Sequence, residues 1–216
     1  MANIKLEKIL YDAFPIGKVQ TINDYYSIKS LANSRKYFDK FNLIYKQKWD
    51  IVKSLQLNDF RLKRQKILDI GAGPHIFAWL AVRLGHYVES TELPMDNPYI
   101  KRPIIEYFKD VKTVIDLDKA VVTHEFTIDK STVQLPNALQ KNWDIITVQR
   151  SNFDIGWIAA DYAFIIPELV KLGNIVYYEC ARQQYTHLVS FCKSVGYKIK
   201  HDLQETGQGK VIIYKE

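Results

Sequence analysis

The stretch of residues 66–93 constrains the fold of this chain more strongly than any other part of the sequence. An apolar run at 67–70 leads into a turn that contains Gly71 and Gly73, and a helical pattern at 76–84 precedes a second strand that ends at Glu92. Glycine lets the backbone come close to a ligand, and the first turn of a helix offers N–H groups at the positive end of its dipole. The pattern therefore predicts a strand, helix, strand unit of the nucleotide-binding kind.

Two acids in this stretch narrow the class of ligand. Asp69 stands two residues before Gly71, and Glu92 follows the turn by about twenty residues. A carboxylate at Asp69 repels a pyrophosphate but attracts a ligand that carries an ammonium and a sulfonium group. Ile76 also stands where the dinucleotide-binding fingerprint has its third glycine. These features favour S-adenosylmethionine, with Glu92 accepting hydrogen bonds from the ribose hydroxyls.

The run ILDIGAG, followed by TEL at the end of the next strand, resembles the first two motifs of the class I S-adenosylmethionine-dependent methyltransferases. The resemblance implies that the turn holds the methionyl part of the cofactor and that the second acid holds the ribose. It assigns these roles to Asp69, Gly71, Gly73 and Glu92. Ala72 and Leu93 within the same motifs, and Thr127, Ile128 and Gln149 at the ends of later strands, complete the predicted cofactor site.

The rest of the chain predicts a sheet of seven strands. Further strand patterns lie at 120–128, 143–148, 174–178 and 197–201, and helical patterns lie at 157–172 and 181–195. Pro167 is expected to kink the first of these helices or to mark its last turns. The short loop ETGQGK leads directly into VIIYK, so the last strand must run antiparallel to its neighbour. The expected fold is α/β: a Rossmann-like, mostly parallel sheet with a reversed C-terminal hairpin, helices on both faces and an N-terminal helical elaboration.

Residues 1–60 are predicted to form a helical cap over the substrate and cofactor, and residues 61–216 the methyltransferase core. Apolar residues recur every three or four positions from Phe38 to Leu55, which indicates one buried helix face. Residues 1–66 hold 14 Lys and Arg against 6 Asp and Glu, which leaves 16 against 18 in the remainder. This basic excess fits either a solvated helix face or contact with a polyanion.

Catalytic candidates come from the ends of the strands, because ligands of open α/β sheets lie outside the carboxyl ends of the strands. Arg150 suits a carboxylate or phosphate on the methyl acceptor, unless it pairs with a neighbouring acid such as Asp154. His75, His124 or Glu179 could take a proton from a hydroxyl acceptor, although methyl transfer needs mainly proximity and orientation. The leading expectation is an enzyme that methylates a small molecule. The alternatives are an RNA or protein methyltransferase, with nucleic acid as partner, and a non-catalytic S-adenosylmethionine-binding accessory protein.

Composition excludes several other classes. The chain of 216 residues is 47% hydrophobic and shows no apolar run long enough for a membrane span and no signal-peptide block, so a cytoplasmic protein is expected. Cys180 and Cys192 are its only cysteines and form no metal-binding motif, so neither a zinc site nor a disulfide is expected.

Overall fold

The computed structural model describes residues 47–59, 61, 63–72, 76–92, 121–126, 134–149, 165–203 and 208–215. These residues fall into two compact units. One unit contains a helix over 47–54 and the helix α4 (Ile76–Arg83). The other contains every strand of the sheet together with the helices α7 (Ile165–Leu172) and α8 (Arg182–Val195).

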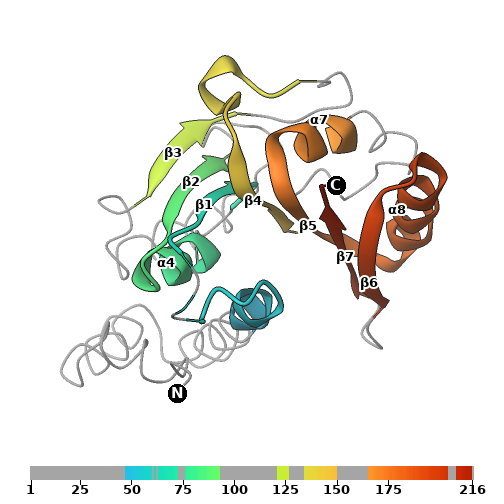
Figure 1. The fold of residues 1–216 in the computed structure, drawn as a ribbon, viewed down its shortest axis with the longest axis horizontal. Coiled ribbons are helices and arrows are strands. Elements are labelled where there is room, and N and C mark those ends of the chain that lie inside the picture. The colour runs from blue at the N-terminus through green and yellow to red at the C-terminus, as the bar shows by residue number, and fades with distance from the viewer. Residues whose placement is uncertain are drawn as a thin grey trace, which may run out of the picture. The chain divides into compact units, whose positions relative to one another are not determined.

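The sheet has seven strands in the order β3-β2-β1-β4-β5-β7-β6 (Figure 1). Their bounds are β1 Lys66–Ile70, β2 Tyr87–Glu92, β3 Val122–Glu125, β4 Trp143–Gln149, β5 Gly173–Ala181, β6 Lys198–Leu203 and β7 Gln208–Tyr214. The first five strands in the chain pair in parallel. Parallel order places the carboxyl ends of β1, β2, β4 and β5 at one edge of the sheet, which is where the predicted site residues should gather.

The reversed C-terminal hairpin is confirmed, and the structure adds its position in the sheet. β7 lies between β5 and β6 and runs antiparallel to both. β6 pairs only with β7 in the described sheet, so the last strand of the chain is internal and the strand before it forms the edge. The fold class expected from the sequence is therefore confirmed as a mostly parallel, Rossmann-like sheet.

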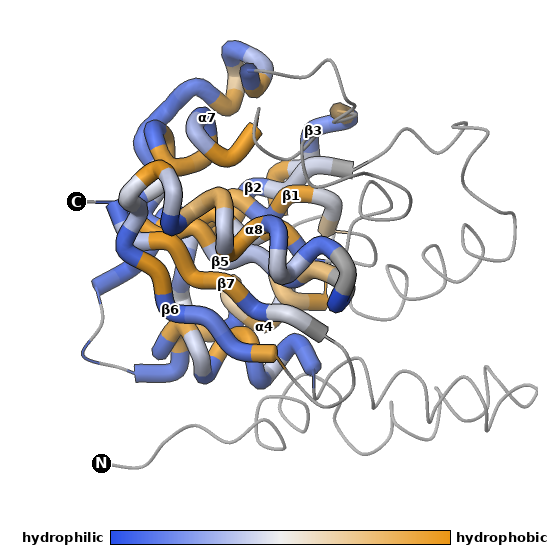
Figure 2. Tube along the Cα trace, turned by 90° about the vertical axis from the view of Figure 1, so that its right-hand side faces the viewer, coloured by the Kyte–Doolittle hydropathy of each residue, from blue (hydrophilic) through white to orange (hydrophobic). Residues whose placement is uncertain are grey.

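One face of the sheet packs against α7 and α8. Side chains alternate between the two faces along a strand, and the buried cluster takes alternate residues from β1, β4, β5 and β7. The same cluster includes residues of both helices, so α7 and α8 cover the same face. Its members from the strands and helices include Leu68, Ile70, Ile146, Val148, Val176, Tyr178, Val211, Ile213, Ile165, Leu169, Leu188 and Cys192. In Figure 2 the tube is largely hydrophobic along β5 and β7, whereas β3 at the end of the sheet is mostly hydrophilic.

The first compact unit contains two buried helical segments. The helix over 47–54 buries Trp49, Ile51 and Val52, which confirms the described end of the predicted N-terminal helix. The ring Nε2 of His86, just after α4, lies 2.9 Å from the carbonyl oxygen of Leu57. The predicted division at residue 60 into a cap and a core remains a prediction, because residues 1–46 lie outside the described residues.

Two details of the helices bear on the sequence prediction. Pro167 lies in the first turn of α7 as described, whereas residues 157–164, where the predicted helix begins, lie outside the described residues. A proline is tolerated there because the first N–H groups of a helix have no partner within it. Gly196 follows α8 with a φ of +86°, a left-handed conformation that ends the helix as expected. In the part of the chain that the structure describes, no helix has the length and apolar character of a membrane span.

Candidate functional site

The buried carboxylate of Asp69 is held by side chains of the neighbouring strand. Asp69 is 1% exposed and pairs in register with Thr147 of β4. Its Oδ1 accepts hydrogen bonds from the hydroxyl of Thr147 at 2.7 Å and from the amide nitrogen of Gln149 at 2.8 Å. An ionised carboxylate accepts hydrogen bonds and cannot donate them, so these two donors stabilise the charged form and fix its orientation. The carboxyl end of β4 therefore positions the acid that precedes the glycine turn.

The described part of the glycine turn, Gly71 and Ala72, is bonded to Thr91 of β2. Gly71 has a φ of +66°, which favours glycine, and its N–H donates to Oγ1 of Thr91 at 3.1 Å. The next N–H, that of Ala72, donates to the carbonyl oxygen of Thr91 at 3.1 Å. Both described amides after β1 are therefore satisfied inside the protein, at a residue that is 2% exposed.

Two further acids lie at the same edge of the sheet. Glu92 is the last residue of β2, directly after Thr91, although the description of this residue covers its backbone only. Glu179 of β5 is buried and stands in register with Gln149 on one side and Lys210 of β7 on the other. The carboxyl edge of the described sheet thus carries mainly acidic and neutral polar groups, with Lys210 opposite one of the acids.

The structure brings part of the predicted cofactor site together. Asp69, Gly71, Ala72 and Gln149 meet around the ends of β1 and β4, and the backbone of Glu92 continues the strand that holds the turn. The direct contact of Gln149 is with Asp69, so its described role is to support that acid. The remaining predicted residues lie outside the described residues, and their roles stay predictions: Gly73, His75, Leu93, Thr127, Ile128 and Arg150.

Two residues of this arrangement were missed by sequence reasoning. Thr91 and Thr147 each hold a predicted site residue, Gly71 and Asp69 respectively. Each threonine is a buried polar residue within a largely buried strand. Thr91 directly precedes Glu92, and Thr147 stands two residues before Gln149, and both of these neighbours were predicted site residues. That placement was a usable signal, because buried hydroxyls need a hydrogen-bond partner.

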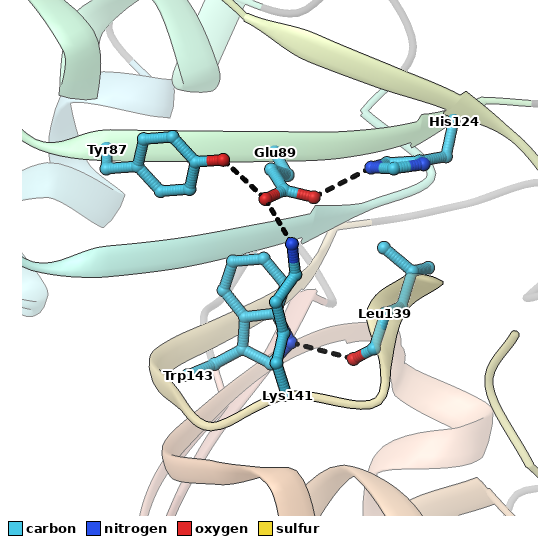
Figure 3. A network of polar contacts seen from close by, with 6 residues as sticks. All are labelled: Tyr87, Glu89, His124, Leu139, Lys141 and Trp143. Carbon is cyan, nitrogen blue, oxygen red and sulfur yellow. Dashed lines mark hydrogen bonds and ion pairs between the residues drawn. The ribbon is translucent and has the colours of Figure 1, made fainter. Parts of the chain in front are cut away.

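A second polar network lies on the opposite face of the strands, centred on Glu89 of β2 (Figure 3). Its Oε1 accepts hydrogen bonds from the hydroxyl of Tyr87 and from Nζ of Lys141, both at 2.5 Å, and its Oε2 lies 2.7 Å from Nε2 of His124. Burial by itself raises the pKa of Glu89, but the hydrogen bonds from Lys141, Tyr87 and His124 outweigh it and hold that pKa below its usual value. His124, a candidate base from the sequence, thus has a structural partner.

The loop before β4 presents Lys141 to this network. The ammonium of Lys141 lies 5.1 Å from the ring centre of Trp143, and the indole N–H of Trp143 donates to the carbonyl oxygen of Leu139 at 3.1 Å. The cation over the aromatic face and the bond from the indole both restrict the loop. The network therefore joins β2, β3 and this loop, and its member His124 stands in register with Thr91.

Comparison with solved structures identifies the fold. The chain is similar to a precorrin-6y C5,15-methyltransferase from Geobacter metallireducens (TM-score 0.50, 16% identity, 76% of this chain and 88% of the other). It is also similar to a TehB-like SAM-dependent methyltransferase from Corynebacterium glutamicum (TM-score 0.50, 15% identity, 82% and 100%). A methyltransferase from Pyrococcus furiosus gives a TM-score of 0.53 at 15% identity, over 76% and 82% of the two chains. No protein-family model matches the sequence, and a search of curated proteins finds no relative. The chain therefore has the fold of the class I methyltransferases.

Proposed function

We propose that this chain is an S-adenosylmethionine-dependent methyltransferase that transfers a methyl group to a small-molecule acceptor. The fold supports a methyltransferase, and the local chemistry of the glycine turn supports this cofactor over a phosphate-bearing nucleotide. The observation that carries the proposal is the combination of a buried acid before the turn with partners inside the protein for the two turn amides that the structure describes.

A phosphate-binding turn needs free N–H groups aimed at the ligand and no negative charge beside it. Here the N–H groups of Gly71 and Ala72 are bonded to Thr91, and Asp69 is buried next to them. A second anion near Asp69 would be repelled, and the repulsion is strong where water is excluded. A ligand with an ammonium and a sulfonium group gains from the same field, so the residues present fit the proposed cofactor.

The proposed roles of the chain follow from this arrangement. When bound, S-adenosylmethionine supplies a methyl carbon that is attached to a positively charged sulfur leaving group. Asp69 would hold the ammonium end, and Glu92 would hold the ribose hydroxyls. In the transfer, a lone pair of the acceptor forms the bond to the methyl carbon while the carbon–sulfur bond breaks and its electrons remain on sulfur. The protein contributes alignment of the acceptor and exclusion of water.

The proposed acceptor contacts are Arg150, His75 and Glu179. Arg150 follows β4 directly and would bind an anionic group of the acceptor. Glu179 or His75 would receive the proton that leaves a hydroxyl acceptor. Glu179 is buried at the carboxyl end of β5, level with Gln149, which is a suitable place for such a base.

The sequence after β4 favours a small molecule over a nucleic-acid base. That segment reads Gln149-Arg150-Ser151-Asn152-Phe153, without the paired prolines that follow Asn or Asp in enzymes that methylate exocyclic base amines. The basic residues before position 67 keep an RNA or protein acceptor as the alternative. Incubation with methyl-labelled S-adenosylmethionine and separated small-molecule, RNA and protein fractions distinguishes these acceptors. Label in the RNA or protein fraction alone would overturn the small-molecule assignment, and binding without label in any fraction would favour an accessory protein.

Calorimetry with S-adenosylhomocysteine tests the cofactor assignment. Asp69→Asn and Glu92→Gln should each weaken binding at least about tenfold, because each removes the charge of a proposed ligand contact. Asp144→Asn is the matched control: Asp144 lies at the amino end of β4, where its Oδ2 accepts the N–H of Lys66 at 2.7 Å, and an asparagine oxygen can still accept that bond. Its affinity should stay within about twofold of the wild type. Tighter binding of NADH than of S-adenosylhomocysteine by the wild type would refute the proposed function.

A further inference from the structure

We propose that Thr91 is a positioning residue that sets the affinity for the amino-acid end of the cofactor. The inference rests on the proposed function and assigns a role to a residue that stands in the TEL motif but receives no role from the resemblance or from the fold comparison. Thr91 uses two different groups on two successive amides: its side-chain Oγ1 accepts from Gly71, and its main-chain oxygen accepts from Ala72.

These two bonds fix the turn in a conformation that glycine alone would not maintain. Gly71 adopts a left-handed φ of +66°, and glycine without a restraint samples many other conformations at little cost. Thr91 is rigid by contrast, because it lies within β2, is buried, and carries a β-branched side chain. The turn therefore takes its position from β2 and not only from β1, whose last residue is Ile70.

The same residue lies between two ends of the proposed ligand site. Its hydroxyl holds the turn that follows Asp69, the acid proposed to bind the amino-acid end of the ligand. In the chain Thr91 is followed directly by Glu92, the acid proposed to bind the ribose. The main-chain bond to Ala72 would persist in any variant, whereas the bond to Gly71 depends on the hydroxyl. Removing the hydroxyl should thus loosen the turn at Gly71, while the bond from Ala72 stays and Glu92 remains in its strand.

The side chain can be tested by variants that separate the hydroxyl from the shape. Thr91→Val keeps the branched shape but has no acceptor, so the N–H of Gly71 loses its partner in a partly buried place. Thr91→Ser keeps a hydroxyl oxygen on Cβ, in the position of Oγ1 of Thr91, and this oxygen can still accept the N–H of Gly71. Thr91→Ala is a second variant without a hydroxyl, which serves if the valine variant does not fold.

Two probes separate the ends of the ligand. S-adenosylhomocysteine contains the amino-acid end, and 5′-methylthioadenosine has the same nucleoside and sulfur without it. By calorimetry, Thr91→Val should weaken the binding of S-adenosylhomocysteine about tenfold and that of 5′-methylthioadenosine by less than about twofold. Thr91→Ser should keep both affinities within about threefold of the wild type, since its oxygen still accepts the N–H of Gly71. The ratio of the two affinities is the informative quantity, because a general loss of folded protein lowers the number of sites and not this ratio.

The outcomes distinguish this inference from the proposed function. A wild type that binds neither probe refutes the proposed function. A wild type that binds both, with an unchanged affinity ratio in Thr91→Val or Thr91→Ala, refutes the role of Thr91 alone. A serine variant that loses S-adenosylhomocysteine as strongly as the valine variant also refutes it, because the hydroxyl would then not be the group that matters.

Discussion

Replacing Glu89 by glutamine should destabilise the fold at neutral pH and have little effect in acid. The substitution preserves the shape of the side chain and removes its charge. Glu89 is 2% exposed, and its two oxygens receive donors from Tyr87, Lys141 and His124. The amide retains one oxygen as an acceptor but places an NH₂ group where the other oxygen received a donor.

The expected cost is about 2 kcal/mol at pH 7. A hydrogen bond to a charged group contributes about 1.5–3 kcal/mol, and the low end applies here because the side chain of Lys141 is 46% exposed and therefore partly screened. Burial raises the pKa of Glu89 and the three hydrogen bonds lower it further than burial raises it, so the folded pKa lies below the ordinary 4.5. The stabilisation is therefore complete above about pH 4.5 and is lost as the pH falls through the folded value.

Urea unfolding, followed by tryptophan fluorescence and circular dichroism between pH 3.5 and 8, measures this effect. The difference between wild type and Glu89→Gln should be largest above pH 5 and should shrink toward pH 3.5. Asp50→Asn is the control, because Asp50 forms a 2.6 Å ion pair with Lys53 in which both side chains are about half exposed. It should cost no more than about 0.5 kcal/mol. Equal stability of the Glu89 variant and the wild type at pH 7, or a difference independent of pH, would refute the reasoning.

Two further predictions concern packing and thiol reactivity. Gly209→Ala should lower the free energy of unfolding by about 2 kcal/mol or more, measured by thermal unfolding, because the added Cβ would lie 2.3 Å from Cδ2 of Tyr185. Gly85→Ala is the control: its Cβ meets no atom within 4 Å, so it should cost only about 1 kcal/mol, from its left-handed φ. Equal losses in the two variants would contradict the packing argument. Burial raises the pKa of the Cys192 thiol to about 11, so it is protonated at pH 8, and Ellman's reagent should label neither Cys192 nor the buried Cys180 before urea unfolds the protein. Rapid labelling of the folded protein would show that one of these thiols is accessible.

Local signals in the sequence predicted most of the described elements. The sequence pattern located β1 and α4 to within about one residue and the end of β2 at Glu92, and the continuous apolar run at 143–148 indicated the strand that the structure shows as β4, between two parallel neighbours. The helix predicted at 157–172 is described from Ile165, with Pro167 as its third described residue, so its start at 157 remains a prediction.

Contacts between distant residues set the limit of prediction for the site. The sequence selected Asp69, Gly71 and Gln149, but it did not show that Gln149 bonds to Asp69 across 80 positions or that Thr91 holds Gly71 across 20. Such partners depend on which strands are neighbours and on the register between them, and neither can be deduced from one segment of the sequence.

The sequence by itself determined the strand, turn and helix pattern, the acids beside the glycine turn, and the reversal of the last strand, because each of these depends on neighbouring residues and on loop length. The tertiary structure alone decided that β7 enters the sheet between β5 and β6, and that Glu89 meets Tyr87, His124 and Lys141 on the face opposite Asp69. The physical reason is that strand order and register arise from burying both faces of the whole sheet at once, so hydrogen-bond partners across strands follow only when the sheet is assembled.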